Sequence, residues 1–361
     1  MFRKASKHLS LVRRNLYHPT RTCHFFIMDE LIQKAIKETQ ESVKPMDSVK
    51  WKPDEPHPQS YFAYDSDKQA WQPMEASGNT QNESGFGITQ LALYSWNVDF
   101  MLPLAKERMD IALAHLEGLT SKLPPTTAAV IYLQESIAQD LTTVGEKPWI
   151  REKYYVTDID DSNWAARYGT TTLVDRRLDI TNCFRVHYAK TRMQRDAFFV
   201  DIVLGGGKTV RLCNTHLESL AFEPPFRPPQ MQVVVKYMHD ENVFGAVAAG
   251  DFNAIQPFDR TLHEDNGLKD AYLELGGKED SEEGYTWGQQ ATTTLRERFG
   301  CSRMDKVYFA GRVKLLSFER FGRDVELSDP AQRERVVSLG FEKPWITDHL
   351  GVVAHFRVED P

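Results

Sequence analysis

The sequence predicts an α/β domain in which two β-sheets pack together and are covered by helices. From Ile88 onward, short apolar runs of strand length recur along the chain, and several of them follow one another in pairs. Helical patterns stand between some of these pairs. Paired strands with inserted helices are typical of two packed sheets flanked by helices.

The first three elements of this domain are a strand, a helix and a second strand. Residues 91–97 form an apolar run of the kind that a buried strand has. Pro103 opens a helical pattern that continues to Gly118, with apolar residues at three- and four-residue spacing. Residues 128–134 (AAVIYLQ) follow turn residues and indicate the second strand.

The later elements are mostly strands. We expect a helix at 230–239 and strands near 154–157, 170–174, 180–188, 197–204, 210–215, 245–249, 303–309 and 351–356. The glycine cluster 205–207 with Lys208 lies between two of these runs and predicts a hairpin turn. It is no phosphate-binding loop, because the required Gly, Lys and Ser/Thr do not follow at the right spacing.

The region before residue 86 differs in composition from this domain, which we place at 86–361. Residues 1–28 carry six Lys or Arg and no acid, so they are either a basic tail or a mitochondrial targeting segment. Residues 29–85 hold one short helical stretch near 28–43 and then many Pro, Ser, Asp and Gln, which predicts a largely disordered tail or linker. The expected compartment is the nucleus or cytoplasm, with the mitochondrion as the alternative.

Overall composition excludes two classes of protein. The formal net charge is −7, which does not fit a chain that captures nucleic acid by its overall charge, although a local basic groove is compatible with it. No apolar run reaches the length of a membrane span, so we expect no membrane partner. The four cysteines show no CxxC or zinc spacing, which favours free thiols in an intracellular protein.

Polar segments follow or end several of the predicted strands, which is where loops collect side chains into a site on a rigid scaffold. These segments are Trp96-Asn97-Val98-Asp99, Leu133-Gln134-Glu135, Asn214-Thr215-His216-Leu217-Glu218-Ser219, Gly250-Asp251-Phe252-Asn253, Arg303-Met304-Asp305 and Thr347-Asp348-His349. Each segment alone is weak evidence, since a lone Asp-x-Asn is most often a turn or a helix cap. The ordered set is what carries the information.

The residue types in this set fit the hydrolysis of a phosphodiester. Mg²⁺ prefers oxygen ligands and takes one or two carboxylates, a role that Glu135 fits. Asp251 and Asn253, two residues apart on an extended segment, point to the same side and can orient and deprotonate a water.

Charge that develops on the phosphoryl oxygens requires hydrogen-bond donors, which His349, His216 and Asn97 can supply. Asp305 is the candidate for fixing the tautomer of the histidine.

The ordered set resembles the signature of the endonuclease/exonuclease/phosphatase (DNase I-like) superfamily, from about Leu91 to Phe356. The resemblance implies a four-layer α/β sandwich of two mostly antiparallel sheets flanked by helices. It also implies a Mg²⁺-dependent phosphoric diester hydrolase, with Mn²⁺ as a substitute metal. The residues that it places at the metal are Glu135, Asn97, Asp99 and Asp348, and the catalytic residues are Asp251, Asn253, His349, His216 and Asp305.

Within the superfamily, the chain is most similar to the tyrosyl-DNA phosphodiesterase 2 branch. The matching segments are His216-Leu217-Glu218-Ser219, Tyr285-Thr286-Trp287 and Arg303-Met304-Asp305-Lys306. This resemblance implies a monomer that acts on 5′-phosphotyrosyl DNA ends, single-stranded or frayed, with Ser219, Trp287 and Arg303 as substrate-binding residues. Phe100, Phe252 and Gly288 depart from the pattern of that branch.

Other functions remain open at this stage. With the same fold, the chain could be an abasic-site endonuclease, a deadenylase-like nuclease or a phosphoinositide phosphatase, or a non-catalytic nucleic-acid-binding module. A basic interval could hold the substrate or be a solvated face, and its members are Arg176, Arg177, Arg185, Lys190, Arg192 and Arg195.

Overall fold

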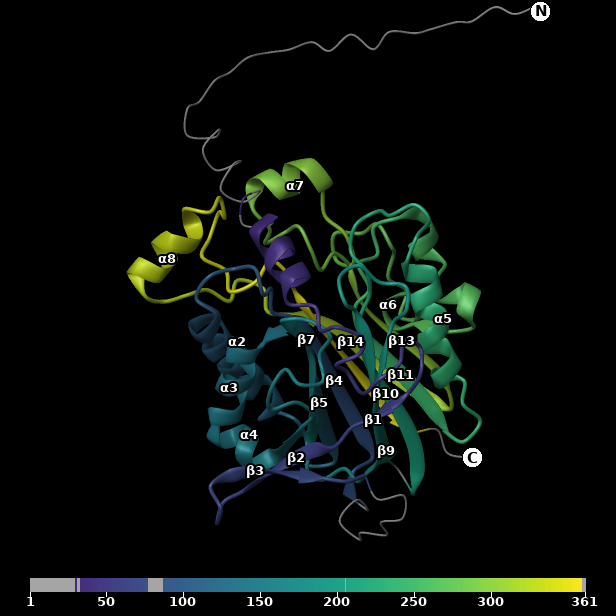
Figure 1. Ribbon diagram of the computed structural model, residues 1–361. Helices are drawn as coiled ribbons and strands as arrows, with labels where there is room; N and C mark the ends of the chain where they lie inside the picture. Colours follow the sequence, from purple (N-terminus) through teal and green to yellow (C-terminus); the bar gives the residue numbers. More distant parts are fainter. Residues whose placement is uncertain (1–29, 31–32, 77–86, 205, 359–361) are drawn as a thin grey trace, which may run out of the picture.

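Two β-sheets form the centre of the molecule in the computed structural model, which describes residues 30, 33–76, 87–204 and 206–358 (Figure 1). In the described residues, one sheet has eight strands, in the order β14 (Val313–Phe321), β15 (Gly351–Val358), β4 (Gln90–Asn97), β5 (Thr127–Ile137), β7 (Tyr168–Asp175), β6 (Tyr154–Val156), β2 (Tyr61–Asp65) and β3 (Ala70–Met74). The other has seven, in the order β1 (His57–Pro58), β8 (Ile180–His187), β9 (Asp196–Leu204), β10 (Lys208–His216), β11 (Gly245–Asp251), β13 (Asp305–Gly311) and β12 (Lys269–Asp270).

Helices cover the outer faces of both sheets, so the molecule has four layers. Figure 1 shows α2 (Ala105–Thr120), α3 (Ala138–Glu146) and α4 (Pro148–Lys153) on one side and α5 (Arg227–Met238) on the other. Shorter helices are α6 (Ala271–Glu274), α7 (Thr293–Phe299) and α8 (Pro330–Val337). The expected α/β sandwich is therefore confirmed.

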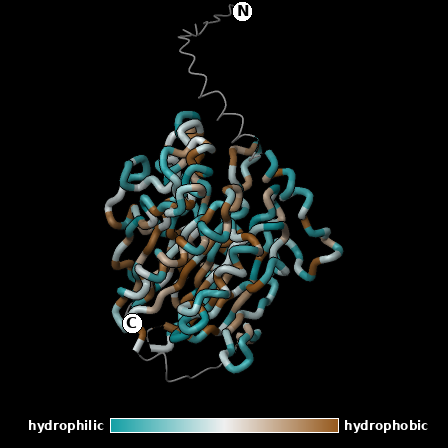
Figure 2. The backbone as a smooth tube through the Cα atoms, turned by 90° about the vertical axis from the view of Figure 1, so that its left-hand side faces the viewer, coloured by the Kyte–Doolittle hydropathy of each residue, from teal (hydrophilic) through white to brown (hydrophobic). Residues whose placement is uncertain are grey.

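The side chains of β4 show how the layers are held together. Leu91 and Leu93 join the hydrophobic cluster between the two sheets, whereas Ala92 and Tyr94 join the cluster under the helices. This alternation follows from the two-residue period of a strand. Figure 2 shows the resulting hydrophobic interior, with hydrophilic residues towards the periphery.

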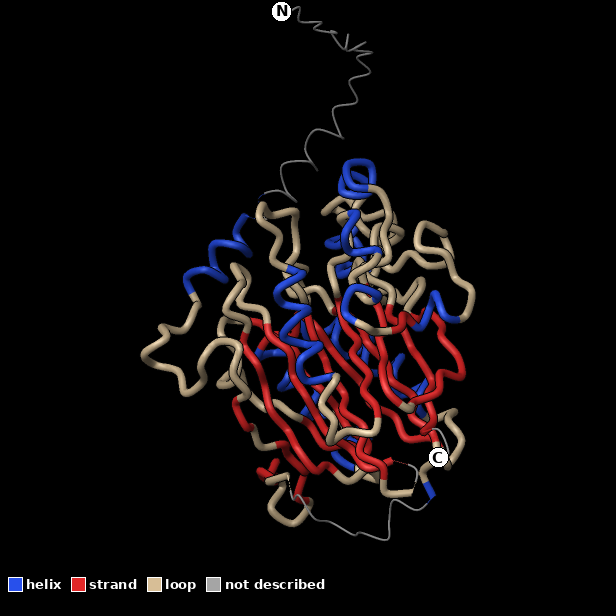
Figure 3. The backbone as a smooth tube through the Cα atoms, turned by 90° about the vertical axis from the view of Figure 1, so that its right-hand side faces the viewer, coloured by secondary structure: helices blue, strands red, loops and turns tan. Residues whose placement is uncertain are grey.

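Most neighbouring strands are antiparallel, as expected, and the two parallel pairs among the described strands lie in the middle of the sheets. β4 is parallel to β5, which sets Asn97 opposite Gln134 at the strand ends. β10 is parallel to β11, which sets His216 opposite Asp251. Figure 3 shows loops and short helices gathered above one edge of the strands. Parallel pairs bring two carboxyl-terminal strand ends to the same edge, so the polar segments that follow them meet there.

Most elements predicted from the sequence are present within a few residues of their expected bounds. The hairpin between β9 and β10 is confirmed, with Lys208 opposite Leu204 and with Gly206 and Gly207 at φ of 71° and 80°. Gly205 of that turn lies outside the described residues. β14 was not predicted, because its exposed and buried residues do not alternate cleanly along this edge strand.

The prediction that residues 29–85 are a disordered tail or linker is wrong for residues 57–74. His57 of β1 is opposite Arg185, and Phe62 of β2 is opposite Val156, so this segment contributes strands to both sheets. Its prolines misled the prediction, since Pro58 and Pro73 lie in the outermost strands. Edge strands tolerate proline because the missing N–H need not serve an inner ladder.

Residues 33–41 form the short helix expected near 28–43, and Glu38 of that helix pairs with Arg167 of the domain.

The proposed basic tail or targeting segment, residues 1–28, lies outside the described residues. Cys183, Cys213 and Cys301 are free thiols. Within the described part of the chain, every helix is too short or too polar to span a membrane.

Trp51→Ala is expected to lower the free energy of unfolding by about 3 kcal/mol, as large-to-small core substitutions do. Trp51 is 7% exposed and stacks on His187 with ring centroids 4.0 Å apart. Urea denaturation would measure the loss, with the exposed neighbour Lys52→Ala as the control. A loss no larger than that of the control would show that the segment around Trp51 does not belong to the folded domain.

Candidate active site

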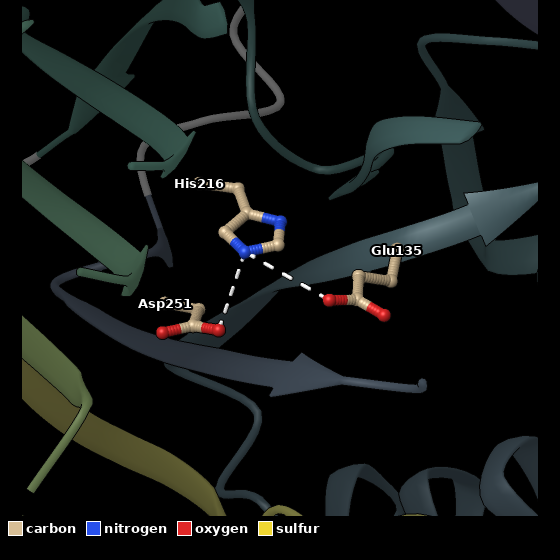
Figure 4. Close-up of side chains that lie close together, drawn as sticks. All are labelled: Glu135, His216 and Asp251. Atoms are coloured by element: carbon tan, nitrogen blue, oxygen red, sulfur yellow. Dashed lines mark ion pairs between the residues drawn. The ribbon is translucent and has the colours of Figure 1, made fainter. Parts of the chain in front are cut away.

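Acidic, amide and imidazole side chains from both sheets meet at the edge where the two parallel strand pairs end. His216 Nε2 lies 3.3 Å from Asp251 Oδ2 and 3.9 Å from Glu135 Oε1 (Figure 4). Glu135 has φ of 60° at an irregularity in the pairing of β5 with β7, between Leu133 and Ser136. A bulge of this kind redirects a side chain. Here it leaves a carboxylate at the end of an apolar strand pointing into the site.

Asn97 joins the two carboxylates. Its Nδ2 donates to Glu135 Oε1 at 3.2 Å and to Asp251 Oδ2 at 3.0 Å. Its Oδ1 accepts from the backbone N–H of Asp99 at 2.9 Å, which fixes the orientation of the amide. The assignment of Asn97 to the metal site stays a prediction: its oxygen accepts from the backbone, and its amino group holds the two acids together.

Asp251 is ionised and held by several donors. Its Oδ1 accepts from the backbone N–H of Asn253 at 2.8 Å. Burial alone would raise the pKa of Asp251, but the neighbouring His216, the charge of His349 and these hydrogen bonds lower it well below its usual range. A carboxylate of this kind orients a water, and because its own basicity is low, it accepts the proton only as attack on phosphorus makes that water acidic.

Asn253 supports the site differently from the expected arrangement. It adopts the left-handed conformation, with φ of 48°, so the segment is not extended there. Its Nδ2 donates to the carbonyl of Leu217 at 3.0 Å. The side chain therefore anchors the segment that carries His216, while the backbone N–H supports Asp251.

His349 forms the expected pair with Asp305. Its Nδ1 lies 2.8 Å from Asp305 Oδ2, and its Nε2 lies 3.8 Å from both Asp251 Oδ2 and Asp348 Oδ1. Burial opposes the charge on this ring, but Asp305 and Asp251 raise the pKa of His349 well above its usual value. His349 is thus a cation placed to stabilise negative charge that develops on a substrate.

His216 has the opposite character. Burial and the neighbouring Arg195 lower its pKa. Arg195 Nη1 donates to His216 Nδ1 at 2.5 Å, so Nδ1 is the acceptor and Nε2–H faces the carboxylates. The Arg195 guanidinium also lies 5.2 Å from the centre of the Tyr168 ring.

The sequence contained a signal for the contact between Arg195 and His216 that the sequence analysis did not use. In the hairpin that the glycine cluster predicts, Lys208 pairs with Leu204. Continued along both strands, that register carries His216 to the start of the opposite strand, next to Arg195.

The number of buried carboxylates fits a bound cation. Burial and the charge of Asp348 raise the pKa of Asp99 to about 6. Burial also raises the pKa of Asp348, although His349 and a hydrogen bond from Trp287 oppose the rise. One ligand atom each from Glu135, His216 and Asp251 lies within 4.8 Å of the others. Oxygen-rich, negatively charged sites of this kind suit a hard divalent cation, with Glu135 as a ligand and Asp99 and Asp348 beside it.

Two loops of the site are held by a residue that the sequence analysis missed. Arg108 of α2 is buried and donates to the carbonyls of Val98 and Asp99 at 2.6 and 2.7 Å. It also donates to the carbonyl of Ile346 at 2.7 Å. Arg108 therefore ties the loop after β4 to the loop that carries Asp348. Sequence alone does not reveal such a role, because its acceptors are backbone atoms.

The three predicted substrate-binding residues differ in their burial and in their partners. Ser219 and Trp287 are half-buried near the site, with Ser219 Oγ 3.1 Å from Met193 Sδ and Trp287 Nε1 donating to Asp348 Oδ2 at 2.7 Å. The role given to Arg303 is wrong: it is 2% exposed, and its guanidinium is paired with Asp270 and Glu279. Those carboxylates neutralise its charge, and its burial keeps it out of reach of a substrate.

Most of the basic interval is structural. Arg176 donates to the carbonyls of Tyr154 and Tyr64, and Arg177 pairs with Asp175. Arg185 is fully buried between Asp158 and Asp196. Only Lys190 and Arg192 combine exposure with the absence of a carboxylate partner among the described residues of this interval.

The comparisons with known proteins agree with this geometry. The model of the endonuclease/exonuclease/phosphatase family matches residues 94–349, so the chain belongs to that family. Members of the family are metal-dependent hydrolases that act on phosphodiester bonds. A sequence search of curated proteins found no match.

Solved structures with the same fold include two TDP2 proteins. Truncated TDP2 from Caenorhabditis elegans is 23% identical, with a TM-score of 0.56, covering 74% of this chain and 98% of that one. TDP2 from D. rerio, in complex with a single-stranded DNA product, is 20% identical, with a TM-score of 0.56, covering 74% and 99%. The human Nocturnin catalytic domain is 15% identical, with a TM-score of 0.51, covering 75% and 95%. At these identities the likeness establishes the fold.

Proposed function

We propose that this protein is a Mg²⁺-dependent 5′-tyrosyl-DNA phosphodiesterase, which removes tyrosine adducts from DNA 5′ ends in the repair of topoisomerase-linked breaks. The observation that carries the proposal is the grouping of Glu135, His216 and Asp251, with the His349–Asp305 pair facing the same Asp251 oxygen. This one buried cluster combines a carboxylate that can orient a water, hydrogen-bond donors for the phosphoryl oxygens and a ligand for a cation.

Each residue has a role in that reaction. Asp251 orients the attacking water and accepts its proton, and the Nε2–H of His216 and the cationic ring of His349 donate to the phosphoryl oxygens. Glu135, with Asp99 and Asp348 nearby, would hold the cation. When bound, the cation neutralises phosphate charge as a Lewis acid.

The choice of a phosphotyrosyl substrate rests on two supports. The segments His216–Ser219 and Tyr285–Trp287 resemble the tyrosyl enzymes, and TDP2 structures share the fold. The chemistry agrees, because a phenol has a pKa of about 10 and leaves more readily than a sugar alcohol. A strong general acid on the leaving-group side is then not required.

Magnesium-dependent release of tyrosine from a 5′-phosphotyrosyl oligonucleotide, leaving a 5′-phosphate, is the expected result for the purified protein. An abasic-site duplex, a polyadenylate strand and a phosphoinositide should be assayed beside it, each with Mg²⁺ and with chelator. Glu135→Gln protein from the same preparation controls for contaminating nucleases. Turnover of another substrate alone would keep the reaction class and reject the tyrosyl assignment.

A further inference from the structure

A cluster of cations and aromatic rings lies beside the site and has no role in the chemistry described so far. The Arg192 guanidinium lies 4.7 Å from the centre of the Phe222 ring and 5.7 Å from that of Phe226. The Lys190 ammonium lies 5.9 Å from the Phe226 ring, and the two rings are 5.3 Å apart and tilted by 31°. We call Lys190, Arg192, Phe222 and Phe226 the cation–aromatic platform.

The charges of this platform are available to a ligand. Lys190 and Arg192 are exposed, and within the described residues neither side chain has a carboxylate or hydrogen-bond partner. Phe222 and Phe226 are half-buried, and Leu220 next to them is 51% exposed. Local positive charge and apolar surface thus occur together on a chain whose net charge is −7.

The platform is fixed in position relative to His216. Glu218, two residues further along the chain, is fully buried and accepts hydrogen bonds from the Thr191 hydroxyl at 2.7 Å and from the backbone N–H of Arg192 at 3.0 Å. Arg227 donates to the carbonyls of Glu218 and Leu220 at 3.0 and 2.8 Å. Both loops of the platform are therefore attached to the strand end that carries a catalytic residue.

We propose that the cation–aromatic platform is a subsite for single-stranded nucleic acid, which binds the substrate strand next to the scissile phosphate. Cations beside stackable rings are the combination that binds such strands, because phosphates pair with the cations and bases stack on the rings. The proposal rests on the proposed function and deepens it, since it names the part of the substrate that this surface holds. An acidic peptide would use the charges but leave the rings without partners.

Binding of fluorescent single-stranded oligonucleotides by the full-length protein tests the proposal, with chelator present to prevent turnover. Phe222→Ala is expected to weaken binding about 5- to 10-fold, as the loss of one stacked base does. Arg192→Gln should weaken binding too, and the slope of log Kd against log salt should fall by about 0.7, the value for one phosphate contact on a single strand. Both losses should grow with oligonucleotide length.

The chain offers a matched control at the opposite end of the same strands. Lys208 and Arg312 lie 5.1 and 5.5 Å from the Phe244 ring, next to the start of β10 and β11. Arg312→Gln removes the same charge from a similar cluster and should leave both binding and activity unchanged. An equal loss in Arg312→Gln, or none in Arg192→Gln, would overturn the proposal, as would polyglutamate competing as well as the oligonucleotide.

The outcomes also separate this proposal from the proposed function. If the wild-type protein releases no tyrosine but its oligonucleotide binding depends on Arg192, the subsite stands and the tyrosyl assignment fails. If tyrosine is released and the platform variants bind like wild type, the tyrosyl assignment stands and the subsite proposal fails.

Discussion

Glu135→Gln is expected to reduce turnover by at least about a thousandfold, because a ligated cation supplies several kcal/mol of transition-state stabilisation and each 1.4 kcal/mol is a factor of ten. The fold should survive, since glutamine keeps an oxygen for the hydrogen bond from the backbone N–H of Phe100, which is 3.1 Å long in the wild type. Initial rates with Mg²⁺ would measure the loss. Exposed Glu152→Gln serves as the matched control.

Thermal unfolding gives a second reading of the same variant. Mg²⁺ should raise the melting temperature of the wild-type protein, because a ligand that binds only the folded state stabilises it by mass action. The increase should disappear in Glu135→Gln. Unchanged activity together with an unchanged Mg²⁺ response would show that Glu135 is not the metal ligand.

Asp251→Asn is expected to lower kcat by about a hundred- to ten-thousandfold with little change in KM, because orientation and deprotonation of the water act in the transition state. The asparagine can still accept the hydrogen bond from the backbone N–H of Asn253. Single-turnover kinetics on a saturating substrate would measure the chemical step directly.

The pH dependence of wild-type activity helps to interpret the Asp251→Asn variant. The pKa of Asp251 is lowered, so its carboxylate stays ionised well into the acid range. Loss of wild-type activity below neutral pH should therefore come from other groups. A large loss of substrate affinity with kcat preserved in Asp251→Asn would contradict the role given to this residue.

The sequence was sufficient to predict the central strands and the carboxylates at their ends. Both features depend on local patterns, such as the apolar run 128–134 before Glu135. The failures came from non-local partners. Arg303 was predicted to bind substrate, but its partners Asp270 and Glu279 lie far from it in sequence. Residues 57–74 were predicted to be a linker because of their prolines, which the edge positions of these strands tolerate.

The orientation of the Asn97 amide could not be predicted from the sequence. Its position was predicted correctly, but the direction of its amide depends on the backbone N–H of Asp99, in a loop that no periodic pattern describes. The same holds for Arg108, whose acceptors are carbonyls of loops distant in sequence. Sequence patterns thus located the site, and the tertiary contacts determined how the side chains within it are oriented.

The site is formed by residues of both sheets, so its geometry depends on how the sheets pack against each other. Asn97 Nδ2 of β4 donates to Asp251 Oδ2 of β11 at 3.0 Å, a contact between the two sheets by residues 154 positions apart. Closing a loop of that length costs conformational entropy, which the packing of the two sheets must offset. A cation bound by residues of both sheets would therefore stabilise the packing of the sheets against one another, in addition to its part in the reaction.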